Sequence, residues 1–326
     1  MINPLKYFKN RKVGLVLGSG GAKGLSHIAV IEYLEAMSIP IDIIVGSSIG
    51  SIVGAIYLIG DLKRFEEDTR KFTKKELLSL FDFTLPKSGI VKGRNFMNLL
   101  QNYIPKDARI EDLPKPFSIV ATDYYTGKQI VFTKGNILEA IRASISIPGV
   151  FVPVYHDGKL LIDGGVANPL PIDVAKDMGA GLTIAVNLHP GLPISKSMRS
   201  SAKPMKSPGK FFKKRNNRLT EEIKRVEAIQ RNDEYSDDIN KPDKHESDNK
   251  YAAPGILEII FRTIDILGYV NTLYILDSYK PTVLIEPDLL ETGTMDFSDA
   301  KNIIIAGYSA ATEKRMELLR KVKFWI

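Results

Sequence analysis

The clearest candidate for chemistry is a serine within residues 46–50, which read GSSIG and follow the pattern G-x-S-x-G with Ser48 in the central place. This pattern is typical of a nucleophile held in a tight turn between a strand and a helix, where its hydroxyl projects above the sheet. The flanking glycines, Gly46 and Gly50, leave room for such a turn. An apolar strand-like run precedes the motif and a helical pattern follows it, so Ser48 is predicted to be a nucleophile. The alternative is a Gly/Ser turn that only caps a helix.

A second glycine-rich turn, GSGGAKG, occupies residues 18–24 and also lies between a predicted strand and a predicted helix. Consecutive glycines let backbone N–H groups converge, and the start of a helix adds positive potential, so this loop is suited to hold an oxyanion or a phosphate. Gly18, Gly20 and Gly24 loosely match a dinucleotide-binding loop. That fold needs an acid after the second strand, where this chain has Gly46. An oxyanion hole beside the serine turn explains both motifs together.

Two residues are candidates for the base that a serine nucleophile requires. Asp163 ends a predicted strand and precedes Gly164 and Gly165, which allow another segment to approach closely. A carboxylate whose pKa is raised by burial can accept a proton near neutral pH. His189 follows a buried strand and is the histidine best placed for a Ser-Asp-His triad. The structural alternatives are a turn aspartate before two glycines and an ordinary loop histidine.

The elements that position these residues follow from hydrophobic periodicity, which predicts alternating strands and helices. Short apolar runs predict strands at residues 12–17, 41–45, 117–123, 129–133, 159–165, 182–188 and 282–287. Helical patterns are found at residues 25–37, 49–59, 61–80, 136–144, 171–178, 256–278 and 298–320. The strands at 117–123 and 129–133 flank YYTGK and are expected to form a hairpin. Two opening strand-turn-helix units are typical of a doubly wound α/β fold with a parallel sheet.

Composition sets further limits. The chain has 326 residues and is 44% hydrophobic, enough for a sizeable core, and its net charge of +7 weakly favours acidic partners such as nucleic acid or anionic lipid. With no cysteine, disulfides, thiolate catalysis and Cys-based zinc sites are excluded. Residues 39–60 are long enough for a membrane span, but their glycines, serines and Asp42 favour a strand, a turn and a buried helix. The N-terminal apolar run is too short for a signal peptide, so a cytoplasmic protein without a transmembrane segment is expected.

Composition changes after residue 192. Residues 195–225 are strongly basic, the following residues to 250 are mainly acidic, and both stretches are poor in hydrophobic residues. This predicts a charged, flexible insertion at 192–254, between a catalytic core at 1–191 and a C-terminal part of the same domain at 255–326. The basic half is a candidate for peripheral contact with an anionic membrane. A solvated loop without such a role explains the composition equally well.

Taken in order, GSGGAKG, GSSIG and IDGG resemble the patatin-like phospholipase family, and their spacing is similar to that of bacterial members related to neuropathy target esterase. The stretches GLSHIAVIEYLE, RASISIPGVFVPV, NTLYILDS and DFSDAKNIIIAGYSAA fit the same resemblance. It covers about residues 11–190 and 256–312. Two features depart from the family pattern: Ser19 stands in the first place of the usual run of three glycines, and the charged insertion has no counterpart.

The resemblance implies a three-layer α/β/α sandwich with a mainly parallel central sheet, and a Ser-Asp dyad in place of a triad. Ser48 is then the nucleophile, Asp163 the base, and the backbone of Gly20, Gly21, Ala22 and Lys23 the oxyanion hole. The implied reaction is hydrolysis of fatty-acyl esters of phospholipids or lysophospholipids, with no metal, no cofactor and no nucleic acid partner. Two alternatives stay open: an α/β-hydrolase-type esterase using Ser48, Asp163 and His189, and a catalytically silent lipid-binding protein on the same fold.

Overall fold

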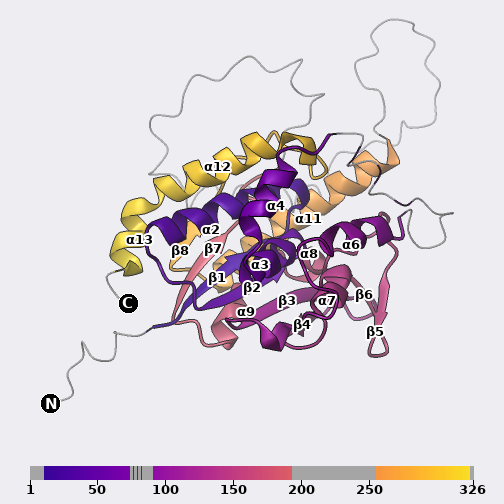
Figure 1. The fold of residues 1–326 in the computed structure, drawn as a ribbon, viewed down its shortest axis with the longest axis horizontal. Helices are drawn as coiled ribbons and strands as arrows, with labels where there is room; N and C mark the ends of the chain where they lie inside the picture. The colour runs from indigo at the N-terminus through magenta and orange to yellow at the C-terminus, as the bar shows by residue number, and fades with distance from the viewer. Residues whose placement is uncertain are drawn as a thin grey trace, which may run out of the picture. The chain divides into compact units, whose positions relative to one another are not determined.

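The central element is a sheet of eight strands, and its innermost strands are apolar because both faces are covered (Figure 1). The computed structural model describes residues 11–73, 76, 79, 82, 91–192 and 255–323. The strands are β1 (Val13–Leu17), β2 (Ile43–Ser47), β3 (Phe117–Asp123), β4 (Gln129–Phe132), β5 (Val154–His156), β6 (Lys159–Asp163), β7 (Leu182–Val186) and β8 (Val283–Ile285). Every residue of β1, β2, β3 and β7 is buried.

The strand order is β5-β6-β3-β2-β1-β7-β8, with β4 paired to β3. The pairs β1–β2, β1–β7, β2–β3 and β7–β8 are parallel, whereas β3–β4, β3–β6 and β5–β6 are antiparallel. The register sets Ser47 of β2 opposite Val120 of β3, and the next residue, Ala121, opposite Asp163 of β6. The sheet alone therefore brings the end of β2 and the end of β6 to the same place.

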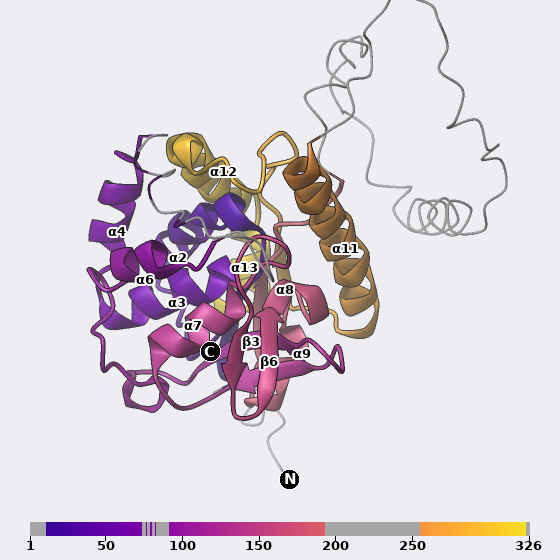
Figure 2. The same ribbon diagram turned by 90° about the vertical axis from the view of Figure 1, so that its right-hand side faces the viewer.

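Helices cover both faces of this sheet (Figure 2). They are α2 (Ser26–Ala36), α3 (Ile49–Ile59), α4 (Leu62–Thr69), α6 (Arg94–Leu100), α7 (Ile137–Ser144), α8 (Gly164–Ala167), α9 (Ile172–Asp177), α11 (Ile256–Ser278), α12 (Ala300–Glu313) and α13 (Arg315–Lys321). The short 3-10 helices within the described ranges are η1 (Gly21–Leu25), η2 (Ile110–Asp112) and η4 (Phe297–Asp299). Figure 2 shows α2, α3, α4 and α6 on one side of the sheet and α9 and α11 on the other.

Two separate hydrophobic cores correspond to these two sides. Alternate residues of β1 divide between them: Leu15 and Leu17 pack in the larger core with α2, α3 and α12, and Val16 packs in the smaller core with α9. Ile275 and Leu276, near the end of α11, also pack against the smaller core. The arrangement confirms the predicted three-layer α/β/α sandwich.

The predicted elements agree with the structure in type and differ in some boundaries. Residues 39–60 form a strand, a turn and the helix α3, as predicted, and the β3–β4 hairpin is present. The helix expected at 61–80 is α4, which ends at Thr69. The helix expected at 298–320 is divided into α12 and α13 at Lys314, whose backbone leaves the helical conformation. Such a break depends on dihedral angles that periodicity does not encode.

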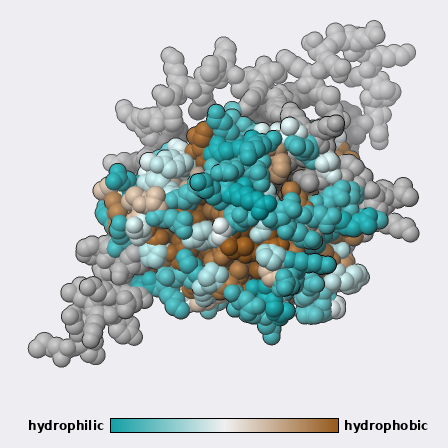
Figure 3. Space-filling view, viewed as in Figure 1, coloured by the Kyte–Doolittle hydropathy of each residue, from teal (hydrophilic) through white to brown (hydrophobic). Residues whose placement is uncertain are grey.

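Two features bear on contact with membranes. Within the described ranges, α11 is the one helix that is long and apolar enough to cross a membrane, judged by length and composition alone. Because α11 also contributes buried residues to the fold, among them Asp265 and Tyr269, its length and composition are weak evidence that it spans a membrane. Figure 3 shows hydrophilic residues over most of one face, with hydrophobic residues gathered near the middle, where α3 lies in Figure 1. The predicted charged insertion at 192–254 lies outside the described residues, apart from Leu192.

Candidate active site

Ser48 lies in a strained turn between β2, which ends at Ser47, and α3, which begins at Ile49. Its backbone has φ 51° and ψ −120°, a conformation that non-glycine residues rarely adopt. The turn is possible because its glycines have no side chains: a Cβ on Gly50 would collide with the carbonyl oxygen of Leu17. Backbone strain of this kind costs on the order of 1–3 kcal/mol and is found preferentially at functional sites.

The hydroxyl of Ser48 donates a hydrogen bond directly to the carboxylate of Asp163, with Oγ and Oδ2 2.6 Å apart. The backbone N–H of Ser48 donates to Oγ of Ser144 at 2.8 Å, and that hydroxyl donates in turn to the carbonyl oxygen of Val120 at 2.6 Å. Ser144 thus ties the serine turn to the middle of β3. This fixes the position from which Oγ meets the carboxylate.

Besides the bond from Ser48, further hydrogen bonds hold Asp163 in place. Its Oδ1 accepts a hydrogen bond from the N–H of Gly165 at 2.7 Å, and its carbonyl oxygen accepts one from Oγ1 of Thr122 at 2.8 Å. The side chain is buried, and burial raises the pKa of the Asp163 carboxyl to about 6, while the hydrogen bonds from Ser48 and Gly165 act in the opposite direction. The carboxyl therefore titrates close to neutral pH, as a proton acceptor needs to.

The glycine loop lies beside this pair. Ser19, Gly20 and Gly21 line the same pocket as Ser48 and Asp163. Gly21 has φ +58°, and a Cβ there would collide with the carbonyl oxygen of Thr294, so only glycine fits.

Hydrogen bonds fasten the loop at both ends. The N–H of Gly18 donates to the carbonyl oxygen of Val186 at 3.2 Å, and that of Ala22 donates to Thr294 O at 2.8 Å. The buried imidazole of His27 adds a contact between Nε2 and the carbonyl oxygen of Gly18 at 2.8 Å. His27, near the start of α2, therefore supports the loop.

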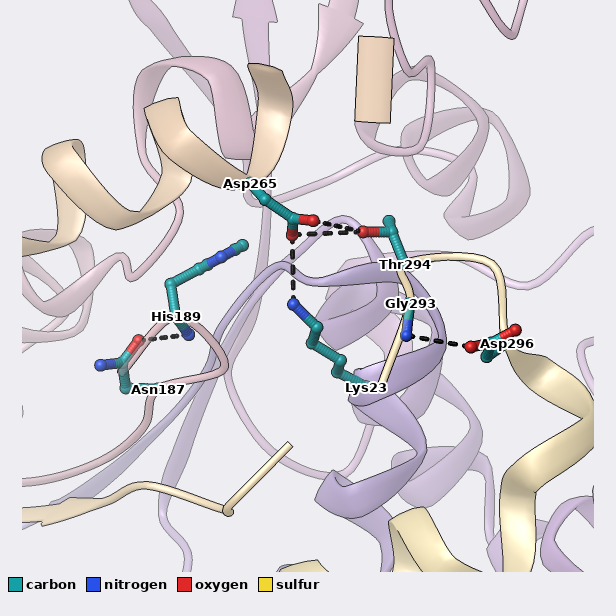
Figure 4. Close-up of polar contacts among 7 residues, drawn as sticks. All are labelled: Lys23, Asn187, His189, Asp265, Gly293, Thr294 and Asp296. Carbon is teal, nitrogen blue, oxygen red and sulfur yellow. Dashed lines mark hydrogen bonds and ion pairs between the residues drawn. The ribbon is translucent and has the colours of Figure 1, made fainter. Parts of the chain in front are cut away.

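Lys23 of the glycine loop forms a buried ion pair with Asp265 of α11 (Figure 4). Nζ of Lys23 lies 3.1 Å from Oδ1 of Asp265 on α11, and the two side chains are only 3% and 8% exposed. Oγ1 of Thr294 donates to the same carboxylate, at 3.2 Å from Oδ1 and 3.1 Å from Oδ2. Lys23 thus joins the glycine loop to α11 through a carboxylate that lines the same pocket as Ser48.

His189 shares the pocket with Ser48, but in the described contacts its ring makes no hydrogen bond to Ser48 or Asp163. Its backbone N–H donates to Oδ1 of Asn187 at 2.9 Å, and its ring packs on Gly268, where a Cβ would be 2.8 Å from Cε1. Burial lowers the pKa of His189 to about 4, and the nearby Lys23 ammonium acts in the same direction. Within the described contacts, its Nδ1 has no hydrogen-bond partner, and the hydroxyl of Ser48 donates to Asp163 without an intervening ring.

The fold and this turn define a class: an α/β protein with a serine at the sharp junction of a strand and a helix, as in serine hydrolases. A family model described as patatin-like phospholipase matches residues 15–176. An uncharacterised NTE family protein of Mycobacterium tuberculosis is 32% identical over 327 residues, covering 93% of this chain and 91% of that protein. The chain belongs to the patatin-like phospholipase family.

Two further relatives are much longer proteins. Patatin-like phospholipase domain-containing protein 6 of Homo sapiens is 36% identical over 182 residues, which are 54% of this chain and 13% of that protein. Neuropathy target esterase sws of Drosophila melanogaster is 33% identical over 189 residues, 56% of this chain and 13% of that protein. Family membership supports a lipid hydrolase activity.

Ser48, Asp163 and the glycine loop are predicted from the sequence, and the structure brings all three together. The residues that hold them in place, Thr122, Ser144, Asp265 and Thr294, are not predicted. For Asp265 a signal was available, because an acid in the middle of a long apolar helix is seldom buried without a partner. In the part of the chain that the structure describes, no group of three or more His, Asp or Glu side chains could hold a metal ion.

Proposed function

We propose that the protein is a serine lipid acyl hydrolase that cleaves fatty-acyl esters of phospholipids or lysophospholipids with Ser48 as nucleophile and Asp163 as base. The single observation that carries this proposal is the 2.6 Å hydrogen bond between Ser48 Oγ and Asp163 Oδ2. The raised pKa of the carboxyl, about 6, supports the role of proton acceptor. A lipid substrate is supported by the family and by relatives whose names include phospholipase and esterase.

The reaction runs in two halves. Ser48 Oγ attacks the ester carbonyl carbon while its proton passes to Asp163, which gives a tetrahedral intermediate with a negative oxygen. The bond to the alcohol then breaks, and the alcohol leaves with the proton held by Asp163. Water attacks the acyl-enzyme in the same way and gives up a proton to Asp163. The bond to Ser48 Oγ then breaks, Oγ takes that proton back from Asp163, and the fatty acid is released.

The negative oxygen needs donors close to the serine. The N–H groups of Gly20 and Gly21 are the candidates, because both residues line the pocket at the start of η1, before its first internal hydrogen bond. Ala22 is also expected in the oxyanion hole, but its N–H already donates to the carbonyl oxygen of Thr294, so this residue holds the loop in shape. The side chain of Lys23 pairs with Asp265, and its backbone N–H remains a further candidate donor.

The test is hydrolysis of a short p-nitrophenyl ester and of a fluorogenic phospholipid by the wild type, Ser48→Ala and Asp163→Asn. Ser47→Ala is the matched control, since its buried hydroxyl lies one residue away and has no hydrogen-bond partner among the described residues. Turnover in the wild type and in Ser47→Ala that is lost in the other two variants supports the dyad. Turnover that survives in Ser48→Ala contradicts it, and lipid binding without turnover in any variant favours the silent binding protein.

Peripheral membrane contact through basic residues 195–225 is a further part of this proposal. These residues lie outside the described part of the chain, so the support is their composition: each base near an anionic surface contributes about 1 kcal/mol. Co-sedimentation with anionic vesicles, compared between the full chain and a variant lacking 195–225, tests the idea. Equal binding of the two proteins removes it.

A further inference from the structure

A second, apolar cavity lies beside the candidate active site and shares no lining residue with the polar pocket around Ser48. Its wall includes Ile49 and Ile52 of α3, Phe65 of α4, and Phe96 and Leu99 of α6. All of its lining residues are hydrophobic apart from Thr69. These helices lie together on one side of the sheet, opposite α11 (Figure 2).

The single polar lining residue does not make the cavity polar. Oγ1 of Thr69 donates to the carbonyl oxygen of Glu66 in its own helix at 2.9 Å, so its hydroxyl is already satisfied. The wall therefore offers an occupant neither a charge nor a free hydrogen-bonding side chain. A phosphate or a sugar would lose its hydration here without compensation, whereas a hydrocarbon chain would gain burial.

At three points along the chain, residues that line the cavity lie close in sequence to residues that line the polar pocket. Ile49 directly follows Ser48, Leu25 ends the short helix that begins at Gly21, and Phe297 lies three residues after Thr294. Ile49 also packs against the glycine loop, because a Cβ on Gly24 would collide with its side chain. The polar pocket and the apolar cavity are thus lined by neighbouring residues of the serine turn and of the segment that begins with the glycine loop.

We propose that this apolar cavity binds the acyl chain of the ester that Ser48 attacks, while the alcohol portion lies in the polar pocket with Asp163; this inference rests on the proposed function. The acyl chain then runs from the carbonyl carbon at Ser48 toward α3, α4 and α6. Chain length is selected by the wall residues Thr69 and Leu99. Each methylene that enters the cavity raises kcat/KM roughly fourfold, the usual effect of burying one CH₂, until the cavity is full.

The experiment compares kcat/KM for p-nitrophenyl esters from butanoyl to dodecanoyl. The variants are Leu99→Trp and Thr69→Leu, which fill the cavity from a partly exposed and from a buried position. Leu267→Trp is the matched control, because it adds the same bulk to an exposed leucine on α11, outside the cavity wall. Thermal unfolding shows which variants are folded. Because there are two filling variants, the comparison can still be made if one of them does not fold.

We expect both filling variants to lower the dodecanoyl-to-butanoyl ratio of kcat/KM at least tenfold, and Leu267→Trp to keep the wild-type ratio. An unchanged ratio in a folded filling variant overturns the inference while leaving the proposed function intact.

A second readout does not depend on catalysis. Calorimetric binding of dodecanoate to Ser48→Ala is expected, and its loss is expected in Ser48→Ala/Leu99→Trp. Equal binding by the two proteins, or no binding by either, also overturns the inference. Failure of the proposed function is seen separately, as absence of turnover in the wild type or its survival in Ser48→Ala.

Discussion

Lys23 and Asp265, which are 242 residues apart in the sequence, form an ion pair of 3.1 Å that is closed off from solvent. Lys23 belongs to the glycine loop and Asp265 to α11, whose residues lie beyond the match to the family model at 15–176. The hydroxyl of Thr294 donates a hydrogen bond to the same carboxylate, and the carbonyl oxygen of Thr294 accepts one from the N–H of Ala22. The C-terminal part of the chain therefore holds the loop that the first part uses.

Because the pair is buried, removing one partner is expected to be far more harmful than removing both. Lys23→Met leaves an unpaired buried carboxylate and should lower the free energy of unfolding by ~3–5 kcal/mol. The double variant Lys23→Met/Asp265→Leu should recover most of that loss. The exposed pair of Lys321 and Glu317, with Nζ and Oε1 2.7 Å apart, is the control: Lys321→Met should cost at most ~1 kcal/mol. Urea unfolding at pH 7 measures all three, and additive losses at positions 23 and 265 would show that the charges do not depend on each other.

The activity should depend on the ionisation of Asp163. As a base the carboxyl must be deprotonated, so kcat/KM for an uncharged ester is expected to rise with pH, with a midpoint near the pKa of about 6, and to level off above pH 7. The pKa of His189, about 4, lies too low to account for this midpoint. A stopped assay from pH 4.5 to 8 measures the profile. A wild-type midpoint far from pH 6, or a profile that does not depend on pH, argues against Asp163 as the base.

The same raised pKa predicts an effect on stability with a definite sign. The carboxyl binds its proton more tightly in the folded protein, with a pKa of about 6 against 3.8, so folding is favoured below pH 3.8 and loses this contribution as pH rises through 6. At pH 7 the ionised, buried carboxylate is a net cost. Asp163→Asn, which is never charged, should therefore increase the free energy of unfolding at pH 7 by up to about 3 kcal/mol.

The pH dependence of that gain separates it from a general packing effect. It should shrink toward zero between pH 6 and pH 4, where the wild-type carboxyl becomes protonated. Thermal or urea unfolding of both proteins at pH 4, 5, 6 and 7 measures the difference. Asp157→Asn, at an exposed hairpin position, is the control that should show no comparable trend. A gain that is the same at every pH would show that Asp163 carries no ionisation penalty.

His189 should be dispensable for turnover. Its ring fills space against Gly268, and in the described contacts it makes no hydrogen bond to Ser48 or Asp163. His189→Gln is therefore expected to keep kcat within about tenfold of wild type, with a modest loss of stability, whereas loss of a triad histidine costs a serine hydrolase many orders of magnitude. Steady-state kinetics on a short ester decide between the two, after thermal unfolding has shown that the variant is folded.

The parts of the site that the sequence reveals are those fixed by local rules. The turn at Ser48 requires small residues at fixed spacing around a nucleophile, and Asp163 ends an apolar strand before two glycines, so both are visible as short motifs. Thr122, Ser144, Asp265 and Thr294 act through contacts with residues distant in the sequence. Nothing local distinguishes such a serine or threonine from a solvated one. The alternating pattern predicts seven of the strands in order, but not the short strand β5, the helices α6 and α8, or the antiparallel pairing of β6 with β3 that brings Asp163 to Ser48.

The strained backbone at Ser48 leads to a last prediction, about the stability of variants at this turn. Ser48 has φ 51°, which a side chain disfavours and glycine tolerates, so Ser48→Gly should be more stable than Ser48→Ala by ~1 kcal/mol. At Ser51, inside α3, the order should reverse, because glycine in a helix costs about 1 kcal/mol relative to alanine. Urea unfolding of the four variants measures both differences in one protein, and each comparison cancels the loss of the serine hydroxyl. If the two positions gave the same order, the turn at Ser48 would not be strained, and the glycines around it would serve only to give the site room.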